Sequence, residues 1–289
     1  MAAVVAGAIA ACRSAAETPP QPAAKKRVTI MTEEKQQVVD VLKSLETGAP
    51  APLEVLSSTR YVQHNLDVAA GVEGVRELMR RLPRGATKVN TVRVFQDGDF
   101  VFAHTEYDFF GPKIGFDIFR FEGGKIVEHW DNLQAKPEKP NRSGHTTTDG
   151  PTQPEDLDRT EANKELIGSY LEDTLVHGRL ERMAAYFDRE KYIQHNPNAG
   201  DGLAARRQAA KERATRDGVL KYDKIHKLLG EGSFVLAVSE GRYGPSGGKH
   251  TCFYDLFRVE GGKIAEHWDT VDTIPEKETW KNKNGKFGF

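Results

Sequence analysis

Two segments of the chain read Glu-His-Trp-Asp, at 128–131 and again at 266–269. Side chains alternate along a β-strand, so His129 and Asp131 are predicted to share one face of a strand, as are His267 and Asp269. The backbones of each pair would lie roughly 7 Å apart, which lets both side chains reach one small ligand. An imidazole beside a carboxylate suits general acid–base chemistry.

A second repeated segment supplies further polar groups. The sequence YVQHN at 61–65 recurs as YIQHN at 192–196. A donor on this strand could stabilise the oxygen of a forming enolate. The candidates are His64 and Asn65 in the first copy, and His195 and Asn196 in the second. Asp117 and Asp255 are expected to orient a histidine across the sheet.

Each of these residues also has a purely structural interpretation. Buried polar groups need partners, so the His–Asp pairs and the QHN histidines could simply hold the sheet together. A metal site built from His64, His129 and Asp131 would suit zinc or iron. Other residues are predicted to form pocket walls or core, mainly through packing. These are Trp130, Trp268, Tyr61, Tyr192, Glu106 and Glu240.

The repeated segments belong to longer repeats. Residues 116–131 and 254–269 differ at four of sixteen positions. The QHN histidines are 131 positions apart and the EHWD aspartates 138, so the second copy carries about seven extra residues between its blocks. So long a period indicates a duplicated domain. We expect a leader at 1–32, domains at 33–134 and 160–289, and a Pro- and Thr-rich linker at 135–159.

Both copies show the same order of secondary-structure signals. Apolar residues recur at helical spacing near the start of each copy, as Val38 and Leu42 do in the first. Segments rich in β-branched and aromatic residues follow and predict strands. The Glu-Gly-Gly before each EHWD strand predicts a tight hairpin turn. Helices followed by an antiparallel sheet define the α+β class.

The segments YIQHNPNAGDG and DLFRVEGGKIAEHWDTVDTIPE resemble the SnoaL-like polyketide cyclases, a family of the nuclear transport factor 2-like superfamily. The resemblance covers nearly all of 33–135 and 160–289. It implies two cone-shaped α+β domains, each with a curved, mostly antiparallel sheet wrapped around N-terminal helices and enclosing a pocket. It also implies cofactor-free chemistry, with Asp131 and Asp269 at the position of the general base. Some relatives are isomerases or dehydratases and others only bind, so the fold does not select the reaction.

We therefore predict a cofactor-independent enzyme that acts on a small hydrophobic or carbonyl-containing ligand. The reaction would be an aldol-type condensation or cyclisation, an isomerisation or a dehydration. The alternative is a binding or interaction module without catalysis. The copies differ in the strand that holds Glu106 and Glu240, where His104 of the first copy matches Val238. The first copy thus has the fuller set of ionisable groups.

Charge and the N-terminal leader bear on partners and location. The chain has 41 Lys and Arg against 42 Asp and Glu, and this balance argues against nucleic acid as a partner. The leader MAAVVAGAIAAC resembles a bacterial lipoprotein signal that would lipidate Cys12 and place the protein in the envelope. It lacks a preceding Lys or Arg, so translation from Met31 and a cytoplasmic protein is the alternative. The two domains are expected to pair with each other or to form a homodimer.

Overall fold

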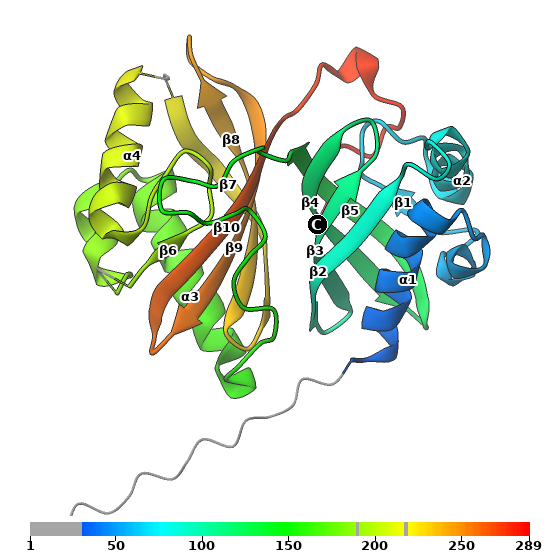
Figure 1. Cartoon of the computed structure of the whole chain (residues 1–289), viewed down its shortest axis with the longest axis horizontal. Helices are drawn as coiled ribbons and strands as arrows, with labels where there is room; N and C mark the ends of the chain where they lie inside the picture. The colour runs from blue at the N-terminus through cyan, green and yellow to red at the C-terminus, as the bar shows by residue number, and fades with distance from the viewer. Residues whose placement is uncertain (1–30, 189–190, 217–218) are drawn as a thin grey trace, which may run out of the picture.

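The computed structural model describes residues 31–188, 191–216 and 219–289 (Figure 1). Cys12 and the rest of the apolar leader lie outside these residues. Among the described helices, none is both long and apolar enough to span a membrane. The described chain forms two units of the same kind, each with a five-stranded sheet and helices, so the predicted α+β class is confirmed.

The first unit wraps one sheet around two α-helices. Its elements are α1 (Glu33–Thr47), a 3₁₀ turn (Ala51–Val55), β1 (Val62–Gln63), α2 (Gly71–Arg81), β2 (Lys88–Asp97), β3 (Phe100–Asp108), β4 (Pro112–Glu122) and β5 (Lys125–Ala135). The strand order is β1-β5-β4-β3-β2. The short β1 runs parallel to β5, and the other neighbours are antiparallel.

The second unit repeats this order with a longer helical region. Its elements are a 3₁₀ turn (Leu157–Arg159), α3 (Thr160–Leu171), a π-helical turn (Glu172–Val176), a 3₁₀ helix (Leu180–Ala185), β6 (Ile193–Gln194), α4 (Gly202–Arg216), β7 (Val219–Glu231), β8 (Phe234–Gly244), β9 (Lys249–Glu260), β10 (Lys263–Thr273) and a 3₁₀ turn (Lys277–Thr279). The strand order, β6-β10-β9-β8-β7, matches that of the first sheet.

Local sequence explains the ends of these elements. Helix α1 begins after Thr32, whose side chain accepts a hydrogen bond from the backbone N–H of Lys35, and ends at Gly48 in the left-handed conformation (φ 71°). The predicted hairpin turns are formed by Gly123–Gly124 and Gly261–Gly262, all with positive φ. Glycine adopts this conformation without steric cost, which is why the turn sequence is the same in both copies.

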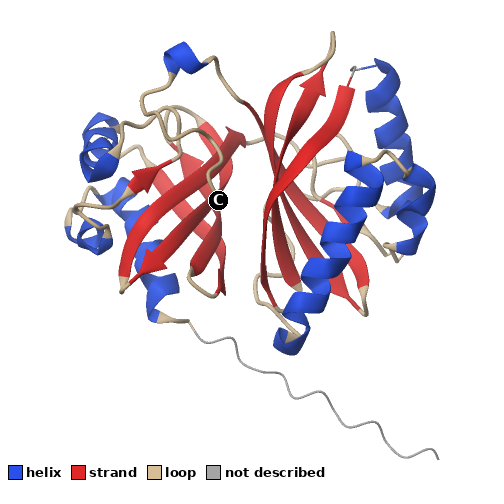
Figure 2. Ribbon diagram, turned by 180° about the vertical axis from the view of Figure 1, so that it is seen from behind, coloured by secondary structure: helices blue, strands red, loops and turns tan. Residues whose placement is uncertain are grey.

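The two sheets pack face to face, and helices cover the outer face of each sheet (Figure 1; Figure 2). One apolar cluster fills the space between the sheets and draws residues from both units. Its largest members are Phe95, Phe102, Phe116, Trp130, Phe234, Tyr254 and Trp268. The side-chain amide of Asn132 also donates to the backbone oxygen of Thr270, 3.0 Å away. Apolar burial of this extent is the main force that can hold two domains as one body.

The linker and the C-terminal segment each cross onto the opposite unit. In the linker, Asn141 donates its side-chain amide to the backbone oxygen of Gln194 on β6. In the C-terminal segment, which reaches the first unit in Figure 1, Asn284 donates to the backbone oxygen of Gln63 on β1, 2.9 Å away. The linker after β5 of the first unit therefore holds β6 of the second unit, and the C-terminal segment after β10 of the second unit holds β1 of the first.

The sheet interface makes a prediction for stability. Trp130 is 1% exposed and stacks on His64 and on Phe289, with ring centroids 4.9 Å and 4.5 Å away. Replacing Trp130 with Ala should lower the free energy of unfolding by about 3–5 kcal/mol, because a large cavity would form between the sheets. Urea denaturation measures this loss. Phe110→Ala is the control: Phe110 is 60% exposed, so equal losses in the two variants would contradict the prediction.

Candidate active site

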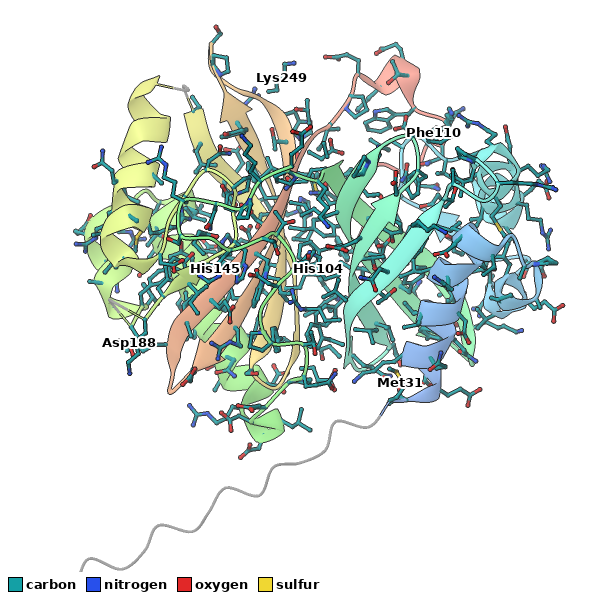
Figure 3. All side chains as sticks on the ribbon, in the orientation of Figure 1. Met31, His104, Phe110, His145, Asp188 and Lys249 are labelled. Atoms are coloured by element: carbon teal, nitrogen blue, oxygen red, sulfur yellow. The ribbon has the colours of Figure 1, made fainter. Side chains whose placement is uncertain are left out.

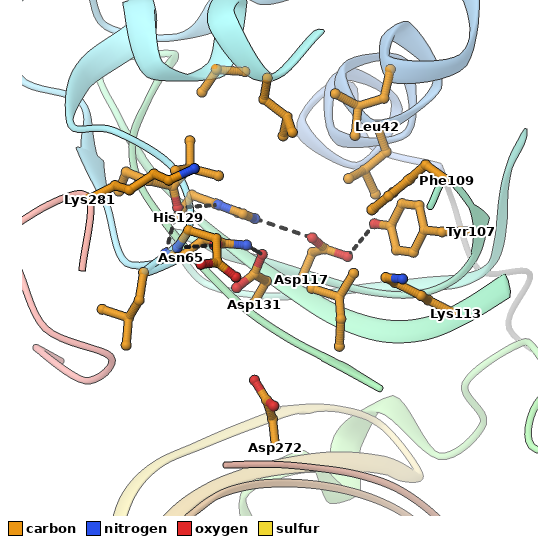
Figure 4. A pocket seen from close by; sticks show the side chains of 18 of the residues that line it. Leu42, Asn65, Tyr107, Phe109, Lys113, Asp117, His129, Asp131, Asp272 and Lys281 are labelled. Atoms are coloured by element: carbon orange, nitrogen blue, oxygen red, sulfur yellow. Dashed lines mark hydrogen bonds and ion pairs between the residues drawn. The ribbon is translucent and has the colours of Figure 1, made fainter. Parts of the chain in front are cut away.

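A cavity of about 470 Å³ lies in the first unit, between the helices and the concave face of the sheet (Figure 4). Helices α1 and α2 contribute apolar walls that include Leu42 and Val75. The sheet side contributes polar groups that include Gln63, Asn65, Tyr107, Asp117, His129 and Asp131, and Asp272 and Lys286 come from the second half of the chain. A mostly apolar cavity with a few convergent polar groups is the usual form of a small-molecule site.

Strand alternation places the EHWD residues as the sequence predicts. His129 and Asp131 line the cavity, whereas Trp130 packs between the sheets. Glu128 lies on the same face as Trp130 and accepts two hydrogen bonds from Arg120. Asp117, directly across from Asp131 in the register of β4 and β5, also lines the cavity. The structure thus brings together His129, Asp131 and Asp117.

Hydrogen-bond partners determine which atom of His129 carries a proton. Gln63 Oε1 accepts the backbone N–H of Asn65 at 2.8 Å, and Gln63 Nε2 donates to the hydroxyl of Tyr61 at 3.2 Å. The amide of Gln63 is thereby oriented with its oxygen toward His129 Nδ1, 2.9 Å away. A carbonyl oxygen only accepts, so His129 Nδ1 must donate. His129 Nε2 then faces Asp117 Oδ1 at 3.2 Å.

Asp117 is the buried centre of this network. Its second oxygen, Oδ2, accepts the hydroxyl of Tyr107 at 2.5 Å. Burial raises the pKa of Asp117, although the hydrogen bonds from His129 and Tyr107 counteract part of that rise. Burial and the nearby Asp117 also raise the pKa of Tyr107 well above its ordinary value, so Tyr107 stays a neutral donor. One proton can be shared between His129 and Asp117.

Asp131 differs from Asp117 in having one oxygen without a hydrogen-bond partner. Its Oδ2 accepts the side-chain amide of Asn65 at 2.5 Å, but its buried Oδ1 has no hydrogen bond within the described structure. Oδ1 forms an ion pair with Lys286 of the C-terminal segment, whose Nζ lies 3.7 Å away. Burial alone would lower the pKa of Lys286, but Asp131, Cys252 and Asp272 outweigh it and raise the pKa, so Lys286 is an ammonium. Sequence reasoning missed Lys286, because only the tertiary fold brings the C-terminal segment here.

The second unit repeats the network around a smaller cavity of about 270 Å³. Gln194 Oε1 accepts the backbone N–H of Asn196 at 2.8 Å and faces His267 Nδ1 at 3.0 Å. His267 Nε2 lies 2.9 Å from Asp255 Oδ1. Asn196 donates to both oxygens of Asp269, at 2.9 Å and 2.7 Å. Unlike Asp131, Asp269 therefore has no oxygen without a hydrogen-bond partner.

A tyrosine hydroxyl meets the central aspartate in both units, but it comes from different strands. Tyr107 on β3 pairs with Val89 on β2. In the second unit, Tyr222 on β7 donates to Asp255 at 2.9 Å and pairs with Gly241 on β8, the counterpart of Tyr107. A Cβ at Gly241 would lie 2.0 Å from the backbone oxygen of Lys221, so this site has no room for a second tyrosine. Alignment of the two copies could not reveal this exchange, because it pairs Tyr107 with glycine.

The QHN histidines are not in the cavities, contrary to their predicted role. Strand alternation turns Gln63 and Asn65 inward and His64 outward. His64 Nε2 bonds Glu128 at 2.9 Å, and the ring stacks on Trp130. His195 bonds Glu266 at 2.8 Å and stacks on Trp268 at 4.5 Å in the same way. These histidines and both tryptophans belong to the contact between the sheets, so they are not pocket walls and do not reach a ligand with His129 or His267.

The remaining predicted site residues also lie away from the two cavities, except Tyr61, which lines the first. Tyr192 belongs to the helix-side core of the second unit. Glu106 accepts a hydrogen bond from Lys136 at 2.6 Å, and Glu240 is hydrogen-bonded to His226 at 2.8 Å. The extra histidine of the first copy, His104, is buried between the sheets (Figure 3) and gives the first cavity no additional ionisable group.

His104 is held as a neutral ring. The guanidinium of Arg93 donates to His104 Nδ1 at 2.9 Å, so the proton sits on Nε2, which has no partner in the described structure. Burial, followed by the charges of Arg93 and His195, lowers the pKa of His104 well below 6.5. Val238 at the matching position also lies in the apolar cluster between the sheets.

Among the residues that the structure describes, three clusters have the spacing to hold a metal ion. Ligand atoms of Asp117, His129 and Asp131 lie within 4.8 Å of one another, as do those of Asp255, His267 and Asp269, and those of His145, Asp149 and His195. The alternative metal site of His64, His129 and Asp131 does not form, because His64 lies on the other face of the sheet from His129. Both ring nitrogens of His129 already have hydrogen-bond partners.

No protein-family model matches the chain, and no curated protein matches it. Among solved structures, TsrD from Streptomyces laurentii is similar, with 22% identity over 35% of this chain and 87% of its own, at a TM-score of 0.31. A candidate ketosteroid isomerase from Kribbella flavida shows 18% identity over 41% and 83%, at 0.33. IdmH, a candidate polyketide cyclase from Streptomyces antibioticus, shows 15% over 36% and 93%, at 0.31.

The orientation of Gln63 can be tested through His129. Gln63→Leu removes the acceptor for two buried N–H groups, and we expect a loss of about 1–3 kcal/mol in the free energy of unfolding. Imidazole ¹⁵N NMR should show a proton on Nδ1 of His129 in the wild type and an altered tautomer balance in the variant. Gln194→Leu is the matched control and should change His267 alone. A wild-type His129 with a bare Nδ1 would refute the assignment.

The neutral state of His104 predicts a pH dependence. Because its pKa is lowered in the folded state, the stability it contributes is fully present above its ordinary pKa of 6.5 and is lost as the pH falls below that value. His104→Gln keeps an acceptor for Arg93 but does not titrate, so its free energy of unfolding should fall less between about pH 7 and pH 5. The exposed His177→Gln serves as the control. Parallel pH curves for wild type and His104→Gln would disprove the prediction.

Proposed function

We propose that the first cavity is the active site of a cofactor-independent enzyme that removes a proton next to a carbonyl group of a small substrate. The observation that carries this proposal is Oδ1 of Asp131, a buried carboxylate oxygen at a cavity with no hydrogen-bond partner in the described structure. Such an oxygen has a lone pair available for a C–H proton. Asp131 is therefore the general base.

Neighbouring groups supply the other functions that the reaction needs. Asn65 holds the second oxygen of Asp131 and so orients the base. The ammonium of Lys286, 3.7 Å from Oδ1, stabilises the enolate oxygen that forms as the proton leaves. His129 has both nitrogens engaged, so it positions Asp117 and does not contact the substrate. Asp117, which accepts the hydroxyl of Tyr107, is a second carboxyl group of the site that can carry a proton, in addition to Asp131.

The enolate can continue in three ways. Return of the proton from Asp131 to another carbon gives an isomerisation. Attack of the enolate carbon on a second carbonyl of the substrate closes a ring, as in an aldol reaction. Loss of a hydroxyl group from the next carbon, protonated by Asp131 as it leaves so that water forms, gives a dehydration. The largely apolar walls favour a hydrophobic substrate, and the SnoaL-like motifs support a base at the position of Asp131.

The second cavity lacks the feature that carries the proposal. Both oxygens of Asp269 accept hydrogen bonds from Asn196, so neither is as available as Oδ1 of Asp131. We therefore assign proton abstraction to the first unit alone. The second unit contributes to the reaction through its C-terminal segment, which brings Lys286 to the first cavity.

Deuterium exchange tests this function directly. A panel of cyclic and acyclic ketones is incubated with the protein in D₂O, and ¹H NMR follows loss of the signal next to the carbonyl. We expect exchange with the wild type and a loss of about 10²–10⁴-fold in rate for Asp131→Asn, since a general base contributes this much. Asp269→Asn is the matched control and should keep most of the rate.

Two outcomes would overturn the proposal. Unchanged exchange in Asp131→Asn would show that another group is the base. Ligand-induced shifts of His129 without any exchange across the panel would favour the alternative, a small-molecule binding module. Circular dichroism of both Asn variants should match that of the wild type, so that lost activity reflects lost chemistry.

A further inference from the structure

The second cavity is lined by a buried arginine, whereas the buried cation of the first cavity is Lys286, which is paired with Asp131. Arg206 on α4 is 7% exposed and lines the second cavity. Counting from the equivalent starts of α2 and α4, Gly71 and Gly202, its counterpart is Val75, which lines the first cavity. The basic sequence ARRQAAKERATR around Arg206 is typical of a solvated helix face, but Arg206 itself is buried.

Arg206 is not neutralised by the residues around it. Its hydrogen bond runs from Nη2 to the hydroxyl of Tyr170, 3.3 Å away. In the part of the chain that the structure describes, no carboxylate lies within ion-pair distance of its guanidinium. A buried cation without an anionic partner is costly, so an arginine kept in such a place indicates that an anion arrives from outside.

The acidic residues of the second cavity are already engaged. Asp255 accepts a hydrogen bond from Tyr222 and lies 2.9 Å from Nε2 of His267, and both oxygens of Asp269 accept hydrogen bonds from Asn196. These hydrogen bonds disperse the negative charge of the two aspartates, so the charge of Arg206 is left for a ligand.

The walls of the cavity indicate what carries the anion. Tyr222 and Phe253 line it and stack on each other, with ring centroids 4.2 Å apart and planes inclined by 22°. Leu220 and Tyr243 add apolar surface. At about 270 Å³ the cavity suits a single ring better than a fused polycyclic compound. Stacked aromatic side chains favour a flat ring as the body of the ligand.

We propose that the second cavity binds a small aromatic carboxylate, with its carboxylate on the guanidinium of Arg206 and its ring against Tyr222 and Phe253. Arginine suits this role because its planar fork bonds both oxygens of a carboxylate. The two units thus carry different sites. The first abstracts a proton, and the second binds an anion. The proposal does not depend on the chemistry assigned to the first cavity.

Benzoate and its neutral analogue benzamide test the proposal. Isothermal titration of the full chain should show benzoate binding more tightly than benzamide. Arg206→Met should weaken benzoate at least about tenfold and leave benzamide within about twofold, since a charge-assisted pair contributes more than one tenfold step. Arg206→Lys should retain part of the benzoate affinity. Arg207→Met, at the next position on α4, should behave like the wild type.

Spectra locate the ligand and separate the outcomes. Benzoate should shift the NMR signals of His267 and not those of His129. Equal affinity for benzoate and benzamide in the wild type would overturn the proposal, as would benzoate affinity unchanged in a folded Arg206→Met. If Arg206→Met unfolds, the wild-type comparison and Arg206→Lys still decide, because an arginine with a structural role alone predicts no preference for benzoate. Thermal unfolding by circular dichroism checks the fold of each variant.

Discussion

Each sheet is buried on both faces, one against its own helices and the other against the opposite sheet, and most of the structure depends on this double burial. The central strands of such a sheet have almost no solvent face, so their polar side chains need partners on either side. On the helix side, His129, Asp131 and Asp117 border the cavity. On the other side, His64 and Glu128 bond each other beneath Trp130. Two polar networks therefore lie back to back on β5, one at a candidate site and one between domains.

Comparison of the two copies shows which hydrogen bonds they share and which residues differ. Both copies keep a glutamine oxygen aimed at histidine Nδ1 and a tyrosine hydroxyl aimed at the central aspartate. The hydroxyl comes from β3 in one unit and β7 in the other, so its position persists while its strand does not. Two features differ between the copies. Val75 of the first matches Arg206 of the second, and Asp131 has an oxygen without a hydrogen bond, whereas both oxygens of Asp269 accept one. These differences change the chemistry of the two cavities without changing the network that orients the histidines.

The C-terminal segment makes the first cavity a product of both units. Its asparagines donate hydrogen bonds to the backbone near β1, and Phe289 stacks on Trp130, so the segment is held on both sides of Lys286, which reaches Asp131. The linker holds β6 in a similar way through Asn141. Each site therefore depends on chain from the opposite half, and this couples the stability of the sheet interface to the geometry of the cavities.

Much of this architecture follows from sequence pattern alone. The repeats define two α+β units, and period-two alternation places His129 and Asp131 on one face, because both signals are local. The same alternation places Gln63 inward and His64 outward, although the sequence-based prediction assigned a chemical role to His64 and none to Gln63. Lys286, Arg206 and Tyr222 were decided only by the tertiary structure. Each reaches its cavity from a segment whose counterpart in the other copy has a different residue or path, so no repeat or periodicity marks it, and only packing of distant segments creates the contact.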